Sequence, residues 1–190
     1  LIISDDAVEG DASTTTTFSN GVLTVDFDSA TGRIQNVKTR EGISVDLTQE
    51  WGYYTSYDSR FHKDGYYQNS GAYIFRPSEP QGNITRIKPR NATFYMSELV
   101  SEVHVQFEQP WIQQTMRLND KTNYIEVEYT VGPIPIDDDI GKEVITKYSS
   151  SIESDHVFFT DSNGREFQKR VRHCRSTWHL NETEPLAGNY

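Results

Sequence analysis

Apolar and polar residues alternate one by one along several short stretches of this chain, and no other feature restricts its fold as strongly. Between residues 23 and 28, Leu23, Val25 and Phe27 are separated by polar residues, and the same period recurs at 103–107 and 125–129. A period of two places every second side chain on one face, so each stretch predicts a half-buried β-strand. No window of a dozen residues has helical periodicity. The chain is therefore predicted to be all-β, a large antiparallel β-sandwich.

Glycine-containing turns connect these stretches. Residues 30–32, Ala-Thr-Gly, are expected to turn the chain into a hairpin partner at residues 34–37. The Asn-Gly pairs at residues 20–21 and 163–164 fit tight turns, which require positive φ angles. Antiparallel neighbours are therefore expected to follow one another along the chain.

The chain is expected to divide into a lead-in segment and one domain. Residues 1–19 are polar and acidic, so we expect a surface linker there. Residues 20–190 are expected to form the sandwich, with further strands at 142–148 and 157–160, where β-branched and aromatic residues gather. The chain starts without Met and stops at Tyr190, and we expect it to be a piece of a longer precursor.

The net charge and hydropathy argue against two classes of partner. The formal charge is -10 and the isoelectric point is about 4.9, so nucleic acid, which attracts clustered Lys and Arg, is not expected to bind. No stretch approaches the roughly 20 apolar residues of a transmembrane helix, so no membrane partner is expected. Residues 169–172 form a basic cluster, which a solvated strand face explains more simply than a polyanion site.

Three Asn-X-Ser/Thr sequons make Asn83, Asn91 and Asn181 candidate glycosylation sites. Asn, Ser and Thr are frequent in this chain, so some sequons of this kind would arise by chance. Composition alone therefore leaves glycosylation and coincidence as equal alternatives. The single cysteine, Cys174, allows no internal disulfide.

The acidic residues and histidines do not form a catalytic or metal-binding motif. Glu126 and Glu128 lie on the polar side of their predicted strand, as solvent-facing carboxylates do. Residues 137–139, Asp-Asp-Asp, fail the spacing of a calcium-binding EF-hand loop and indicate an acidic surface loop. Residues 173–179 include two His and one Cys, but nothing nearby supplies the further ligands that zinc needs. We therefore expect neither a catalytic residue nor a metal ligand in this chain.

Nine aromatic residues fall within residues 51–75. Aromatic faces stack on the C–H faces of sugars, so this block could line a glycan groove. Tyr and Trp also fill sandwich cores and domain interfaces, and we favour that structural interpretation. The members are Trp51, Tyr53, Tyr54, Tyr57, Phe61, Tyr66, Tyr67, Tyr73 and Phe75.

Five strings in this chain resemble, in the same order, segments of the lysosomal α-mannosidases, glycoside hydrolase family 38. They are spread over most of the chain, so together they are more specific than a single catalytic motif. The strings are SGAYIFRP (70–77), VGPIP (131–135), GKEVIT (141–146), FFTDSNGREFQKR (158–170) and LNETEP (180–185).

The resemblance falls on the part of that family that follows the catalytic domain. It implies a large sandwich of the galactose-mutarotase-like kind, which is incomplete in this chain and is completed by strands beyond Tyr190. It also implies that the aspartate nucleophile and the zinc ligands lie in an earlier domain, outside this chain. Asn189 and Tyr190 match the start of a segment that reaches the rim of the family's active site, so Tyr190 is the candidate sugar-binding residue. The context of Asn181 resembles that of glycosylated relatives.

The resemblance further implies an activity and a setting. The assembled enzyme would be a retaining, zinc-dependent α-mannosidase that removes terminal α-D-mannose from N-glycan oligosaccharides, with this chain as a non-catalytic segment or processed subunit. Its partners would be the catalytic domain, the rest of the sandwich, a mannose-containing oligosaccharide and further copies in a homo-oligomer. The expected location is the lysosome, with a vacuole or secretion as alternatives.

Two other classes of function compete with this interpretation. One is a carbohydrate-binding or structural β-sandwich without an enzymatic role. The other is a self-sufficient mutarotase-like enzyme, which would need a His and Glu pair facing one cleft. The histidines are scattered singly along the sequence, which argues against that enzyme.

Overall fold

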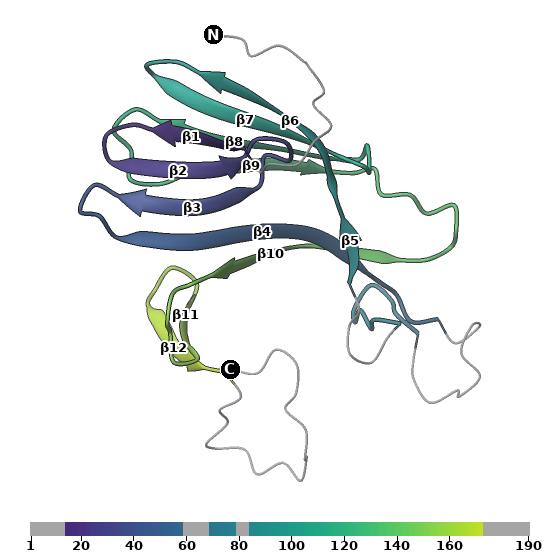
Figure 1. The fold of residues 1–190 in the computed structure, drawn as a ribbon. Helices are drawn as coiled ribbons and strands as arrows, with labels where there is room; N and C mark the ends of the chain where they lie inside the picture. The colour runs from purple at the N-terminus through teal and green to yellow at the C-terminus, as the bar shows by residue number, and fades with distance from the viewer. Residues whose placement is uncertain (1–13, 59–68, 79–83, 173–190) are drawn as a thin grey trace. The chain divides into compact units, whose positions relative to one another are not determined.

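The described residues form antiparallel β-sheets. A computed structural model of the chain describes residues 14–58, 69–78 and 84–172, and in these every regular element is a strand. Up to Ser151 two sheets lie face to face, and Ile152 begins a second unit that contains a hairpin (Figure 1). The all-β prediction is therefore confirmed. No helix in the described part of the chain is long and apolar enough to cross a membrane.

Strand β4 (Ser44–Thr55) pairs with three other strands of the first sheet. On one side it pairs with β3 near its start and with β5 at residues 51–53, and on the other side it pairs with β10 along residues 47–55. The sheet order is β1-β2-β3-β4-β10, with β5 as a side partner of β4. The other strands are β1 (Thr15–Ser19), β2 (Leu23–Asp28), β3 (Ile34–Thr39), β5 (Thr85–Ile87) and β10 (Lys142–Ser150).

The second sheet is a meander in which each strand pairs with the next along the chain. Its order is β6-β7-β8-β9, so β6 and β9 are the edge strands in the described residues. Short hairpin connections explain this order, because they leave little chain for any crossover. The strands are β6 (Pro89–Met96), β7 (Val100–Phe107), β8 (Ile112–Asn119) and β9 (Glu126–Val131).

The core lies between the two sheets and follows the alternation in the sequence. On β2, Val25 and Phe27 are almost completely buried, and Val103 on β7 is buried in the same cluster. Phe18 of β1 packs against Phe27 and against Phe94 of β6, with ring centroids 5.0 and 5.9 Å apart. Burying a side chain of this size stabilises the fold by about 1.5–3 kcal/mol before entropy is counted. These contacts hold the β1 side of one sheet against the β6 side of the other.

The first sheet begins earlier than the sequence predicts. Residues 15–19, assigned to the linker over residues 1–19, form β1 and pair with β2 along their whole length. The Thr run looks like a polar linker, but Thr is β-branched and suits a strand whose alternate side chains face solvent. The predicted strands at 23–28, 34–37, 103–107, 142–148 and 157–160 are confirmed, and that at 125–129 is observed as β9, which begins at Glu126 and ends at Val131.

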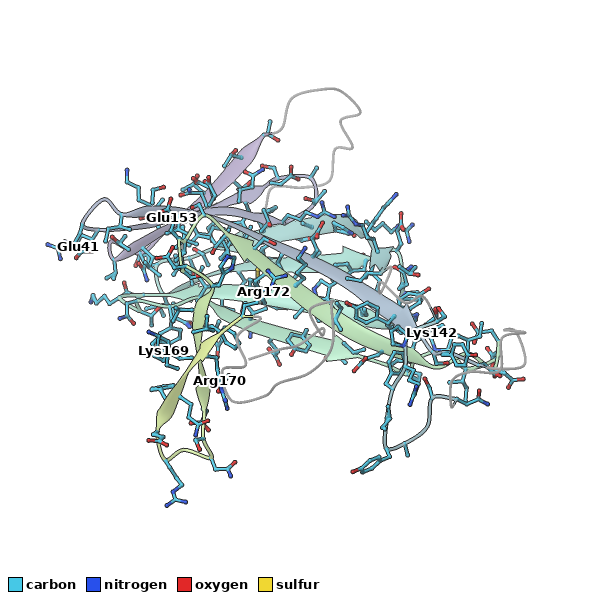
Figure 2. The ribbon with its side chains drawn as sticks, turned by 90° about the horizontal axis from the view of Figure 1, so that it is seen from below. Glu41, Lys142, Glu153, Lys169, Arg170 and Arg172 are labelled. Carbon is cyan, nitrogen blue, oxygen red and sulfur yellow. The ribbon has the colours of Figure 1, made fainter. Side chains whose placement is uncertain are left out.

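The described residues of the second unit, 152–172, form a hairpin, in which the predicted Asn-Gly turn is present. Asn163 and Gly164 have φ angles of 52° and 70°, as a tight turn of this kind requires. Arg170 donates hydrogen bonds to two polar side chains of its own hairpin, whereas Lys169 is exposed (Figure 2). These contacts support the interpretation of residues 169–172 as a solvated strand face. The two strands are β11 (Val157–Asp161) and β12 (Phe167–Val171).

The sandwich is open on the side where β9 and β10 lie. β10 extends the first sheet one strand past β4, whereas the described part of the second sheet ends at β9. As a result, Tyr129 on β9 and Tyr148 on β10 are 52% and 48% exposed. Both strands also have an unpaired edge within the described residues, and such edges favour pairing with further chain.

The turn between β2 and β3 is pressed onto the opposite sheet. Gly32 in this turn is buried and has a φ angle of 67°. A Cβ atom at this position would lie 2.7 Å from Ala92 Cβ on β6 and 2.8 Å from Val105 Cγ2 on β7. Only glycine allows both the left-handed backbone and this close approach.

Replacing Gly32 with Ala is expected to lower the free energy of unfolding by about 3 kcal/mol, because backbone strain and overpacking add. Gly21→Ala is the matched control, since Gly21 has a φ angle of 80° but open space around it, and should cost about 1 kcal/mol. Urea denaturation of the two variants measures the difference. Equal losses would show that the turn does not pack as closely as described.

Candidate functional site

A pair of glutamines joins the two sheets within the core. Gln49 lies on β4 and Gln114 on β8, and they are 6% and 4% exposed. Their amides exchange two hydrogen bonds, each 2.8 Å between nitrogen and oxygen. The indole N–H of Trp51 donates to the same Gln114 oxygen at 2.9 Å. Because a slip of either strand would leave buried polar atoms unpaired, this network fixes how the sheets face each other.

The network continues to the open side of the sandwich. Gln49 Nε2 lies 3.0 Å from Thr146 Oγ1 and from Tyr148 Oη, both on β10. Burial raises the pKa of the Tyr148 hydroxyl. The Tyr129 ring meets the Trp51 ring edge-on, with centroids 5.0 Å apart. Hydrogen-bonding groups and aromatic faces therefore extend from the core to the surface between β9 and β10, which suits contact with a polar partner.

One amino group holds the loop at residues 132–141, which connects the two sheets. Lys142 Nζ, on a side chain that is 9% exposed, donates to the carbonyl oxygens of Pro135 and Ile140 at 3.0 and 3.2 Å. It also binds the Asp138 carboxylate at 2.8 Å. Lys142 is the first residue of β10 (Figure 2). Hydrogen bonds from Lys142 and then from the Ile140 backbone lower the pKa of Asp138. The predicted acidic loop is thus a surface loop with its central carboxylate paired to Lys142.

A row of ion pairs crosses the outer face of the second sheet. Arg117 on β8 binds Glu102 on β7 and Glu128 on β9, with nitrogen–oxygen distances of 2.5 and 2.6 Å. His104 Nε2 lies 2.9 Å from the other oxygen of Glu102. The hydrogen bonds from His104 and then Arg117 lower the pKa of Glu102, and those to Glu128 and Glu102 raise the pKa of Arg117. The row ties three neighbouring strands together, and it confirms that Glu128 faces solvent.

Asn91 is the predicted site residue that the structure describes. Asn91 and Thr93 are exposed on β6, an edge strand, so the sequon is accessible there. Whether it carries a glycan stays a prediction. Asn83, Asn181 and Tyr190 lie outside the described residues, and their roles stay predictions too.

The aromatic residues in the block at residues 51–75 do not share one environment. Trp51 and Tyr57 are buried, and Tyr53 packs near Trp111 with ring centroids 6.4 Å apart, as the structural interpretation predicts. Tyr73, in contrast, is 96% exposed. The members outside the described residues are Phe61, Tyr66 and Tyr67.

The described residues offer few groups for bond-breaking chemistry. They contain no group of three or more His, Cys, Asp or Glu side chains placed to hold a metal ion. His104 and Glu102 do form a pair, which their separation by one residue on a strand could have predicted. That pair lies on an outward sheet face, however, and Arg117 also binds the carboxylate.

Sequence reasoning missed the glutamine network, although one signal for it is visible. Along β8 the buried positions are Ile112, Gln114, Met116 and Leu118. A polar residue in the apolar register of a strand indicates a buried hydrogen-bonding group. Gln49 on β4 gives the same signal, because it lies between Leu47 and Trp51 in the inward register, but neither β4 nor β8 was predicted as a strand.

Gln114→Leu is expected to lower the free energy of unfolding by about 2–4 kcal/mol, because it leaves Gln49 Oε1 and the Trp51 N–H buried without a partner. Gln113→Leu is the matched control, since Gln113 is the exposed neighbour on the same strand. The Gln49→Leu/Gln114→Leu double variant should lose less than the sum of the two single variants. Additive losses in chemical denaturation would contradict the network.

Glu102→Gln is expected to destabilise the protein at neutral pH but have less effect in acid. The folded pKa of Glu102 lies below its unfolded value, so its stabilising contribution is present above about pH 4.3 and is lost as pH falls through the folded pKa. Denaturation curves between pH 3 and pH 7 test this. Glu126→Gln serves as the control, because Glu126 is exposed on β9. The same pH profile for both variants would argue against the ion-pair row.

Comparison with known proteins gives the family. The model described as "Glycosyl hydrolases family 38 C-terminal domain" matches residues 18–190. The chain is 41% identical over 173 residues to an α-mannosidase of Canavalia ensiformis, which covers 90% of this chain and 17% of that protein. It is 40% identical over 172 residues to the lysosomal α-mannosidase of Mus musculus, covering 90% of this chain and 16% of that protein.

The human lysosomal α-mannosidase gives a similar result. It is 37% identical over 175 residues, covering 92% of this chain and 17% of that protein. The chain thus spans about one sixth of the length of the curated relatives it matches. Since the family model and these alignments both extend over most of its residues, the chain belongs to glycosyl hydrolase family 38, in the region of that family's C-terminal domain.

Proposed function

We propose that this chain is a non-catalytic segment or processed subunit of an α-mannosidase that hydrolyses terminal α-D-mannose residues of N-glycan oligosaccharides. The observation that carries the proposal is the match of 90% of this chain to proteins named α-mannosidase. The family model that it matches is the C-terminal domain, which supports a role beside the catalytic domain.

The chemistry of the described residues is consistent with a non-catalytic role for this chain. A glycosidase needs two carboxyl groups on either side of the bond that it breaks. Here Glu102 and Glu128 are both bound to Arg117 on an outward sheet face, and Asp138 is bound to Lys142. The described residues also do not fit a zinc ion, because they lack three clustered ligands. The proposal assigns the nucleophile, the acid and the zinc ligands to residues outside this chain.

This chain would act by supporting the catalytic domain and by completing one wall of its pocket. The glutamine network and the loop bound by Lys142 are held by hydrogen bonds, which supports a role in fixing a partner's position. Tyr190 is the proposed contact with the sugar, and it would bind a hydroxyl without taking part in bond cleavage. The proposed partners are the catalytic domain, the rest of the sandwich and further copies in a homo-oligomer.

The proposed location is the lysosome, reached through the secretory pathway. Relatives from mouse and human are named lysosomal α-mannosidase. N-glycosylation at Asn91, Asn83 and Asn181 fits that route, and the exposure of Asn91 on an edge strand supports the first of these. A vacuole or secretion are the alternatives, since the same route leads to both.

A carbohydrate-binding or structural sandwich without an enzymatic role is the second candidate. The half-exposed rings of Tyr129 and Tyr148 favour it, because aromatic faces beside hydrogen-bonding groups suit sugars. The same rings also suit a protein partner. The two candidates differ in whether the assembled protein cleaves a mannoside.

Native mass spectrometry of the purified protein, followed by denaturation of the same sample, tests the proposal. A particle much heavier than 21.8 kDa that contains this chain and hydrolyses an aryl α-D-mannoside is the expected result. An aryl β-D-mannoside serves as the control substrate, and a metal chelator should abolish the activity. A lone inactive species near 21.8 kDa plus glycans, which binds mannose resin, would favour the second candidate instead.

A further inference from the structure

Strand β4 leaves a gap between its two partners on one side. β3 pairs with residues 44–46 and β5 pairs with residues 51–53, while β10 occupies the opposite edge of β4. Residues 47–50 therefore have no strand beside them on the β3 side within the described part of the chain. Figure 1 shows β4 running past β3 toward β5.

Two hollows lie around this gap and share three residues. One has a volume of about 370 Å³ and the other about 340 Å³, a size typical of sites for small molecules. Both are lined by Glu50, Trp51 and Arg86. Ile84 and Ile145 add apolar walls to the first hollow.

The charged groups that line the hollows are mostly cations. They are Arg33, Arg86, Lys88 and Lys147, against the single carboxylate of Glu50, which gives a local charge of +3 in a chain of net charge -10. Arg86 reaches Glu50 only at 3.6 Å, with its own side chain 74% exposed. Among the described residues, no carboxylate forms an ion pair with the other three cations.

Arg33 and Lys88 line the same hollow, so their charges repel each other, and an anion between them would remove that repulsion. Arg and Lys are also the side chains that bind phosphate and sulfate oxygens through charge-assisted hydrogen bonds. We propose that the gap between β3 and β5 binds a small anion of about the size of a sugar, with a phosphate or sulfate group held by Arg33, Arg86 and Lys88.

The oxyanion would lie in the hollow that Arg33, Arg86 and Lys88 line together, and the rest of the ligand would lie against Ile84 and Ile145. Glu50 lines both hollows and can accept hydrogen bonds from ligand hydroxyl groups. This site is independent of the proposed mannosidase activity, because none of its residues is assigned to mannose binding or cleavage.

Calorimetric titration of the intact protein at constant ionic strength tests the site. Glucose 6-phosphate is expected to bind at one saturable site per chain, whereas glucose should not bind there. Arg33→Ala/Lys88→Ala should weaken this binding about tenfold or more, because two charge-assisted contacts are lost. Lys38→Ala/Arg40→Ala is the matched control, since it removes one Lys and one Arg that are exposed on the same protein but do not line either hollow.

Inorganic phosphate in a parallel titration identifies the part of the ligand that is recognised. Weaker binding of phosphate than of glucose 6-phosphate supports a sugar-sized ligand. Equal affinity overturns that part of the proposal and leaves an oxyanion site alone. The whole proposal fails if the unaltered protein shows no saturable binding, or if both double variants weaken binding to the same extent.

Discussion

The rest of the first unit depends on the contact that β4 makes with the second sheet through Gln49 and Trp51. β4 carries β3 and β5 on one edge and β10 on the other, so its inner face positions most of the first sheet at once. Apolar burial holds two sheets together but allows them to slide, because it has no direction. The paired amides of Gln49 and Gln114 remove that freedom, since any displacement would leave both of them unsatisfied.

Local alternation made half of this architecture predictable. β2 and β7 have clean apolar and polar faces, so their strands could be located from residues 23–28 and 103–107 alone. β4 was not predicted, because Gln49 interrupts its apolar face and its later residues were grouped with an aromatic block. β1 escaped because a run of Thr looks like a linker until its partner strand is known.

The candidate site was less predictable than the fold, for a physical reason. The contacts of Gln49 with Gln114 and Tyr148 join residues 65 and 99 positions apart, and no local pattern encodes such a pairing. The row of ion pairs at Glu102 and Arg117 could not be predicted either, because its geometry depends on strand register. The sequence did contain five strings that resemble family 38 α-mannosidases, and the match to the family model confirms that family. Membership of the family does not locate any of these contacts.

Charged side chains have two different environments in the sandwich, one on the outer face of the second sheet and one in the loop connections. On the second sheet, Arg117 lies between two carboxylates, so its charge is neutralised within the protein and adds to strand cohesion. In the connections from β2 to β3 and from β5 to β6, Arg33 and Lys88 have no such partners among the described residues. The partly buried pair of Arg117 and Glu102 therefore adds to stability, whereas the cations without partners do not.

The polar groups on the open side between β9 and β10 restrict which kind of partner can cover it. Tyr129 and Tyr148 present aromatic faces, but the Tyr148 hydroxyl already shares the amide of Gln49. A purely apolar partner would bury this hydroxyl and the free strand edges without giving them hydrogen bonds, at a cost of about 1–3 kcal/mol for each unsatisfied group. A partner strand with polar side chains on its inner face would give hydrogen bonds to the Tyr148 hydroxyl and to the strand edges. The backbone of a neighbouring domain supplies hydrogen-bonding groups along a strand edge more readily than a sugar does. The chemistry of this side therefore agrees better with a role in supporting a larger enzyme than with a free-standing carbohydrate-binding module.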